Sequence, residues 1–153
     1  MKVRIEIDDT IQEEEVVIRC RKMDENILRI QEAVTERSEA GRHMTLRQGE
    51  KEYYLPVEEI LFFETESKVV YAHTRDKMLE TEYKLYELEE MLPGFFMRIS
   101  KSAIVNLNHI YSITRNLTAS SVVEFVQSHK QVYVSRNYYK VLVERLAEKR
   151  RKL

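Results

Sequence analysis

A series of short runs rich in Val, Ile, Tyr, Phe and Thr is the feature that most constrains the fold. Runs of this kind, separated by turn residues, predict β-strands. They lie at about residues 52–57, 60–64, 69–74, 78–83, 104–106, 110–114, 121–126 and 131–134. Strands and helices do not alternate along the chain, which argues against a doubly wound parallel sheet. The sequence therefore predicts a mainly β fold with a few helices, of the α+β class.

Two stretches with helical periodicity interrupt or follow these strands. Leu85, Leu88 and Leu92 fall at a spacing of three and four residues, and Pro93-Gly94 should end that helix. A last helix should start near Asn137. Its expected apolar stripe consists of Tyr138, Val141, Leu142 and Leu146. Pro56 predicts an edge or an end for the strand that contains it.

The first forty residues form a different pattern. Residues 3–7 alternate apolar and charged side chains, and residues 16–20 are a second β-rich run. Asp24 is suited to cap a helix, with Gly41 just past its end. We expect a small strand-strand-helix unit over residues 1–41, with a dimerisation or regulatory role, followed by the main domain over residues 42–153. Because two strands and a helix bury little surface, the unit should pack on the main domain or on a second copy.

Composition indicates a soluble, globular protein, with 43% apolar and 33% charged residues. No apolar run approaches the ~20 residues of a membrane-spanning helix, and the acidic, alternating start does not resemble a signal peptide. Cys20 is the only cysteine, so an internal disulfide is excluded. A single thiol suits a reducing compartment, and we expect a cytoplasmic protein.

The net charge of −1 hides a strong asymmetry along the chain. Residues 97–153 carry eleven Lys and Arg against three Asp and Glu, whereas residues 1–40 and 41–96 are both acidic. A basic segment in a near-neutral protein is the electrostatic pattern expected of a nucleic-acid binder. The alternative is a solvated C-terminal helix, since residues 149–152 alone supply four of the eleven cations.

Residues 96–110 combine apolar anchors with groups suited to nucleic acid. Arg and Lys neutralise phosphates and read guanine edges, while Ser and Asn bond phosphates or bases. Arg98, Ser100, Lys101 and Ser102 should lie on a short turn that faces outward, although Arg98 could instead pair with an acid such as Glu64. We expect a structural role for Asn106 in a turn or in strand pairing.

The same stretch, F-F-M-R-I-S-K-S-A-I-V-N-L-N-H-I, resembles the LytTR-type DNA-binding domain of bacterial transcription regulators. Two further pieces match that family in the right order. Ile60-Leu61-Phe62-Phe63-Glu64 resembles its first strand motif, and Val132-Tyr133-Val134-Ser135-Arg136-Asn137-Tyr138 resembles its closing motif. Together they cover roughly residues 44–148, and three ordered motifs are far more specific than one.

The resemblance implies an elongated β-rich domain whose loops, rather than a recognition helix, enter the DNA grooves. It implies DNA contacts in the loop after Glu64, in the turn near Lys101 and at the start of the last helix. Carried over by position, the DNA-binding candidates are Ser67, Lys68, Arg98, Ser100, Lys101, Ser102, Ser135, Arg136 and Asn137. The first loop is the weakest match, because apolar Val69 and Val70 stand where polar residues are common and Glu66 would repel phosphate.

The resemblance also implies partners. We expect double-stranded DNA as the target, a homodimer on repeated sites, and a small membrane protein as a candidate regulator. Many family members carry a phosphorylatable receiver domain ahead of the DNA module; forty residues are too few for one, so we expect a stand-alone regulator.

From the residue types and their spacing, we expect no enzymatic activity, no cofactor and no small-molecule substrate. Phosphate-binding glycine loops and nucleophile motifs are absent from the sequence, and the four histidines lack metal-ligand spacing, so no metal site is expected. The second hypothesis is a β-rich module that binds an acidic protein surface or RNA but not DNA.

Overall fold

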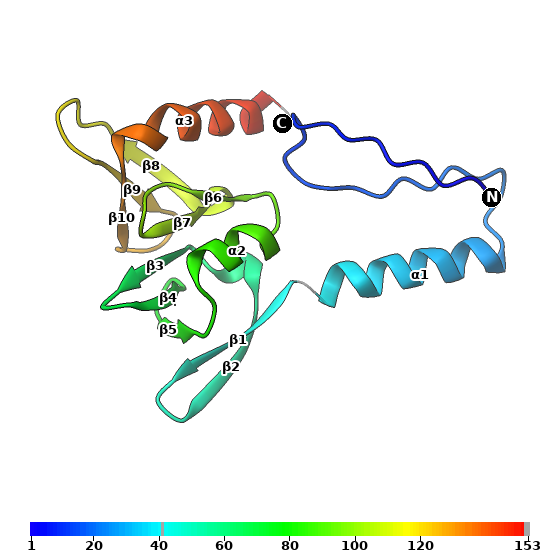
Figure 1. The fold of residues 1–153 in the computed structure, drawn as a ribbon, viewed down its shortest axis with the longest axis horizontal. Helices are drawn as coiled ribbons and strands as arrows, with labels where there is room; N and C mark the ends of the chain where they lie inside the picture. Colours follow the sequence, from blue (N-terminus) through cyan, green and yellow to red (C-terminus); the bar gives the residue numbers. More distant parts are fainter. Residues whose placement is uncertain (41, 152–153) are drawn as a thin grey trace.

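The computed structural model describes residues 1–40 and 42–151, and it shows two antiparallel sheets with two helices packed against them and a third that projects away (Figure 1). The larger sheet has seven strands in the order β2-β1-β5-β4-β3-β7-β6. Its strands are β1 (His43–Gln48), β2 (Lys51–Pro56), β3 (Phe62–Glu66), β4 (Val69–His73), β5 (Met78–Thr81), β6 (Phe96–Arg98) and β7 (Ala103–Asn106). The smaller sheet contains β8 (Ile110–Thr114), β9 (Ser121–Phe125) and β10 (Gln131–Val134), in the order β10-β9-β8.

The helices are α1 (Glu25–Ala40), α2 (Leu85–Met91) and α3 (Arg136–Arg151), with short 3-10 turns at Val57–Glu59 and Leu107–His109. Leu92 caps α2 in an extended conformation, immediately before Pro93. Proline disfavours helical geometry in the residue that precedes it, so α2 ends where the sequence predicts. The predicted α+β class is confirmed, and Pro56 ends β2, which is an edge strand of the larger sheet.

Strands β3 and β7 lie at the centre of the fold, because both of their faces are buried. Successive side chains of a strand point to opposite faces. Phe63 and Ile104 therefore enter a core cluster with α2, whereas Phe62 and Val105 enter a second cluster with the smaller sheet and α3. The side chains of Phe63 and Val105 are fully buried. These two clusters fix both α2 and α3 relative to the same pair of strands.

Asn106 is the buried polar residue at the end of β7. Its side-chain amide donates to the carbonyl oxygen of Ile60 at 2.9 Å, and its side-chain oxygen accepts from the N–H of Asn108 at 2.9 Å. These bonds join β7 to the segment that precedes β3. The expected structural role of Asn106 is confirmed.

His73 is held in its neutral form inside the fold. Its ring stacks on Phe62 with a centroid distance of 4.3 Å, and Lys130 Nζ lies 3.3 Å from its Nδ1. Burial, followed by the charge of Lys130, lowers the pKa of His73 to about 4. Protonation of this ring therefore favours the unfolded chain, in which the imidazole has its ordinary pKa.

We expect the free energy of unfolding to fall as the pH drops from about 6.5 to about 4, because the unfolded chain binds a proton on His73 in this window and the folded chain does not. The contribution is about 2 kcal/mol, below the full linkage value because water reaches part of the ring. Urea unfolding at several pH values measures it. The His73→Phe variant, which keeps the stacking but cannot titrate, should lose this part of the slope; an unchanged slope would contradict the assignment.

The N-terminal unit differs from the sequence prediction. Its helix is confirmed as α1, with Asp24 Oδ1 accepting from the N–H of Ile27 at 2.9 Å. The expected strands at 3–7 and 16–20 are wrong: within residues 1–24, all of which are described, no strand is formed. Strands need a neighbour to satisfy their backbone groups, and these segments lie away from both sheets (Figure 1). Gly41 lies outside the described residues.

Three details of the main domain also differ. The sequence missed β1 and β6, whose patterns are short or interrupted by polar residues. Strand β3 continues beyond residue 64 to Glu66, and Val69 and Val70 belong to β4. On α3, Val141 is exposed, and Tyr139 packs on the core with Tyr138, Leu142 and Leu146.

Candidate nucleic-acid interface

Two backbone hydrogen bonds bring the three predicted contact regions together. The N–H of Thr65 in β3 donates to the carbonyl oxygen of Ser102 at 2.8 Å. The N–H of Ser135 donates to the carbonyl oxygen of Ile99 at 2.9 Å. The loop between β6 and β7 is thereby held between the β3–β4 hairpin on one side and the start of α3 on the other. We call this set of three segments (66–69, 99–102 and 135–137) the loop face.

The β3–β4 hairpin ends in a two-residue turn. Glu66 pairs with Val69, which leaves Ser67 and Lys68 as the turn residues, with φ angles of 50° and 70°. A type I′ hairpin turn has positive φ at both central positions, and Asn-Gly is usual there. Non-glycine residues in this region are uncommon. Ser67 and Lys68 are both exposed at the tip of the hairpin, as is Glu66.

The β6–β7 loop is braced from within. Ser100 Oγ accepts from the N–H of Ser102 at 3.1 Å and lies 3.3 Å from its hydroxyl oxygen. Lys101 is exposed between them. Among the residues that the structure describes, no carboxylate lies within ion-pairing distance of Lys101. The ammonium group is therefore available to an anionic ligand.

Arg98, the last residue of β6, is held by its neighbours instead of lying free on an outward turn, in line with the alternative that it pairs with an acid. Its Nε donates to the carbonyl oxygen of Ser100 at 2.6 Å, and one Nη donates to that of Lys101 at 2.5 Å. The other Nη pairs with Glu89 of α2, so the acid is not Glu64. A rigid guanidinium suits this task, because its donors have a fixed geometry. Arg98 thus joins α2 to the loop that carries Lys101.

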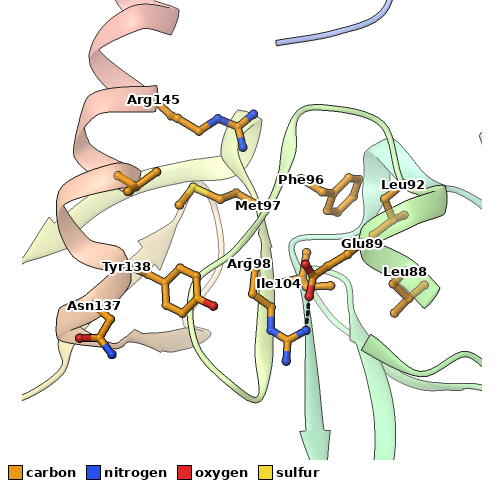
Figure 2. A pocket seen from close by; sticks show the side chains of 11 residues that line it. Leu88, Glu89, Leu92, Phe96, Met97, Arg98, Ile104, Asn137, Tyr138 and Arg145 are labelled. Atoms are coloured by element: carbon orange, nitrogen blue, oxygen red, sulfur yellow. Dashed lines mark hydrogen bonds and ion pairs between the residues drawn. The ribbon is translucent and has the colours of Figure 1, made fainter. Parts of the chain in front are cut away.

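Figure 2 shows this pair in its setting, a cavity of about 350 Å³ between α2, β6 and α3. Arg98 lies between Glu89 of α2 and Tyr138 of α3. At the other end, Arg145 donates to the carbonyl oxygen of Gly94, in the turn between α2 and β6. The side chains that line the cavity therefore join α2, the turn before β6 and α3.

The third region is the first turn of α3. The carbonyl oxygen of Ser135 accepts from the N–H groups of Tyr138 and Tyr139, both at 3.1 Å. The side chains of Arg136 and Asn137, in the first turn, are exposed. The first N–H groups of a helix lack intrahelical partners, and its N-terminus favours anions. Phosphate groups suit this end of α3.

Arg115 is a residue that the sequence reasoning counted only as charge. It follows β8, and its guanidinium lies 5.2 Å from the ring centroid of Tyr139, in the first turns of α3. In Figure 1 the loop after β8, the start of α3 and the tip of β3 lie on the same, left-hand side. Nothing in the local sequence marks Arg115, since its neighbour on α3 is 24 residues away.

Burial and the neighbouring Glu66 raise the pKa of Glu64, with burial the larger cause. Glu66 belongs to the loop face, and Glu64 lies just before it on β3. Their negative charge lowers the positive potential at this end of the loop face.

Within residues 1–40 and 42–151, no group of three His, Cys, Asp or Glu side chains is arranged to hold a metal ion. None of the described helices is long and apolar enough to cross a bilayer.

A mainly β domain that gathers exposed polar and basic loops on one side is suited to bind nucleic acid through those loops. Residues 50–147 match the family model described as the LytTr DNA-binding domain. The chain belongs to this family. Its resemblance to the family, noted from three sequence motifs, is thereby confirmed.

Similar proteins agree with this assignment. A Staphylococcus aureus (strain NCTC 8325 / PS 47) protein named as an uncharacterized HTH-type transcriptional regulator is 31% identical over 149 residues, covering 96% of this chain and 99% of that protein. A relative in the bovine strain RF122 / ET3-1, with a similar name, is 31% identical over 150 residues, with the same coverage. The alignments thus extend well into the N-terminal unit.

A solved structure also matches. It is described as the LytTr DNA-binding domain of a putative methyl-accepting/DNA response regulator from Bacillus cereus, with a TM-score of 0.61 and 25% sequence identity. The match covers 67% of this chain and 96% of that one.

The names of the Staphylococcus aureus relatives include a helix-turn-helix (HTH), which consists of two helices joined by a short turn. No such pair occurs in residues 42–151, where α2 and α3 are separated by β6 to β10.

Proposed function

We propose that this chain is a sequence-specific transcriptional regulator that inserts the loop face into successive major grooves, as a dimer on repeated DNA sites. The observation that supports it most directly is the pair of backbone bonds, Thr65 to Ser102 and Ser135 to Ile99, which gathers three exposed polar segments on one side. Family membership supplies the DNA-binding class. The major groove, about 12 Å wide, is where the edges of the bases differ enough to be distinguished.

Within this proposal, the candidate residues have different roles. Lys101 and Arg136 reach the DNA, because both are exposed and carry positive charge. Ser67, Lys68, Ser102 and Asn137 add hydrogen bonds to phosphates or base edges. Ser100 and Ser135 act mainly by holding their segments, and Arg98 is a positioning residue for the loop of Lys101.

Selection of bound sequences from random duplex DNA, with the full-length chain at two salt concentrations, tests the proposal. We expect a repeated motif with half-sites about one helical turn apart, and affinity that falls steeply with salt. Binding that is sensitive to salt but enriches no sequence would reduce the loop face to a general basic surface.

A second candidate function is RNA or acidic-protein binding through the same cations. The departure of the β3–β4 hairpin from the family pattern favours it, because apolar Val69 and Val70 lie in β4 and offer no polar contact to DNA. A competition assay tests this alternative. Labelled duplex DNA bound by the chain is challenged with unlabelled single-stranded RNA or with unlabelled duplex DNA of equal length. Displacement by RNA at lower concentration than by DNA would favour this alternative.

The Arg136→Ala variant separates base reading from phosphate binding. If the guanidinium forks onto a guanine, its loss should cost ~1–3 kcal/mol and relax specificity at one base position. Fluorescence anisotropy with the selected site and with single-base variants measures both quantities. Arg136→Lys is the matched control, since it keeps the charge but cannot form the bidentate contact. Equal losses on every DNA sequence would assign Arg136 to the phosphate backbone.

A further inference from the structure

Residues 2–8 are exposed in a way that a folded chain does not normally tolerate. Val3, Ile5 and Ile7 are 87%, 84% and 96% exposed. Arg4 Nε pairs with Glu6 Oε1 at 3.1 Å, two residues apart, as in an extended strand. Apolar side chains therefore lie on one face of this segment and charged ones on the other. Neither face has a partner in the described chain, and the backbone forms no ladder.

We propose that residues 2–8 pair with the same residues of a second copy, as antiparallel strands related by a two-fold axis at Ile5. In this register Lys2 lies opposite Asp8, Arg4 opposite Glu6, and Val3 opposite Ile7. Every charged pair then joins opposite signs, and every apolar side chain meets an apolar one. Cross-strand pairs of both kinds stabilise a sheet, whereas like charges destabilise it.

The alternative within one chain is a hairpin with the second β-rich run. The register that aligns the apolar residues of 3–7 with Val16, Ile18 and Cys20 places like charges opposite each other. Lys2 then faces Arg21, Arg4 faces Arg19, and Asp8 faces Glu15. A shift by two residues places Ile7 opposite Glu14, or Val3 opposite Lys22. Self-pairing between two copies satisfies the pattern, and the hairpin does not.

A short anchor would connect this interface to the main domain. The side-chain amide of Gln12 donates to Glu148 Oε2 at 3.1 Å and to the carbonyl oxygen of Arg145 at 3.4 Å. Glu13 pairs with Arg42. The backbone carbonyl of Gln12 contacts Gly94 so closely that a side chain there would collide with it. Only residues 9–11 separate the pairing strand from this anchor, so the dimer would hold two loop faces at a limited distance.

This interface rests on the proposed function, because it supplies the contact that would form the proposed dimer. Its test measures dimerisation without DNA. Sedimentation of the full-length chain should show a concentration-dependent dimer. Arg4→Glu and Glu6→Arg should each raise the dimer Kd about tenfold, since two-fold symmetry converts two attractive pairs into repulsive ones. An equimolar mixture of the two variants should recover the wild-type Kd, because each copy then complements the other. The Arg4→Glu/Glu6→Arg double variant should recover it as well.

Arg21→Glu and Glu14→Arg are matched controls, with the same charge changes on exposed residues outside the paired segment. They should leave the Kd unchanged. Since Arg4 and Glu6 are more than 70% exposed, all the variants should keep the wild-type melting temperature. A monomeric wild-type chain would overturn the interface and leave monomeric DNA binding untouched. Dimers that are insensitive to Arg4→Glu, or that the mixture fails to restore, would overturn the register.

A crosslink tests the position of the axis. In a Cys20→Ser background, Ile5→Cys should form an intermolecular disulfide readily, since opposed cross-strand residues have Cα atoms within bonding range. Val3→Cys alone should crosslink slowly, and its mixture with Ile7→Cys quickly. Equal rates at positions 3 and 5 in the single variants would overturn the two-fold pairing at Ile5.

Discussion

The Leu88→Asp variant is expected to lose its cooperative thermal transition. Leu88 is fully buried in the cluster between α2 and the larger sheet. The change removes a core side chain, which costs ~2–5 kcal/mol, and places an unpaired carboxylate in apolar surroundings, which costs several more. The sum is comparable to the whole stability of a domain of this size. Circular dichroism during heating measures the outcome.

Tyr86→Asp is the control on the same helix. Tyr86 is 68% exposed, so the same aspartate there should shift the melting temperature by only a few degrees. If Leu88→Asp melts as cooperatively as Tyr86→Asp, the buried face of α2 is misassigned.

Loss of specific DNA binding, by roughly two orders of magnitude, is expected for the Lys101→Ala/Arg136→Ala double variant. Each side chain supplies a charged contact worth ~1–3 kcal/mol on DNA. Both are exposed and neither belongs to a core cluster, so the free energy of unfolding should change by less than ~0.5 kcal/mol. Anisotropy with the selected DNA site, together with urea unfolding, measures both results.

Lys51→Ala/Arg75→Ala removes the same charge far from the loop face. Arg75 follows β4 at the end opposite the hairpin turn, and Lys51 lies over the ring of Tyr53, as Lys77 does. This control should bind DNA nearly as well as the wild type at moderate salt, because distant surface charges are screened. Equal losses in the two double variants would indicate a diffuse charge effect and favour the non-DNA alternative.

Most elements of the main domain could be predicted from the sequence, for a physical reason. β-branched and aromatic runs between turn residues marked most of the strands, and Leu85, Leu88 and Leu92 marked α2. Short elements such as β6 were not predicted, because three residues carry almost no periodicity. The strands expected at 3–7 and 16–20 have a strand pattern without a partner in the described chain, and a pattern alone does not supply the missing hydrogen bonds.

The candidate site was also predicted only in part. The positions of its three segments were found from sequence motifs, and the DNA contacts assigned to them stay predictions. Arg98 illustrates the limit. Local sequence suggested an outward cation, yet Glu89 and the carbonyl oxygens of Ser100 and Lys101 occupy its donors. Arg115 illustrates the converse, since only its contact with Tyr139 relates it to α3.

By itself, the sequence determined the class of fold, the core positions of β3, β7 and α2, and the charge asymmetry, because these follow from local periodicity and composition. The family followed from the resemblance of three sequence motifs to known members. Only the tertiary structure decided that the hairpin turn, the β6–β7 loop and the start of α3 lie side by side. Their proximity depends on hydrogen bonds between residues 37 and 36 positions apart, from Thr65 to Ser102 and from Ser135 to Ile99. Contacts at such separations follow from how the two core clusters pack on β3 and β7, which no local pattern encodes.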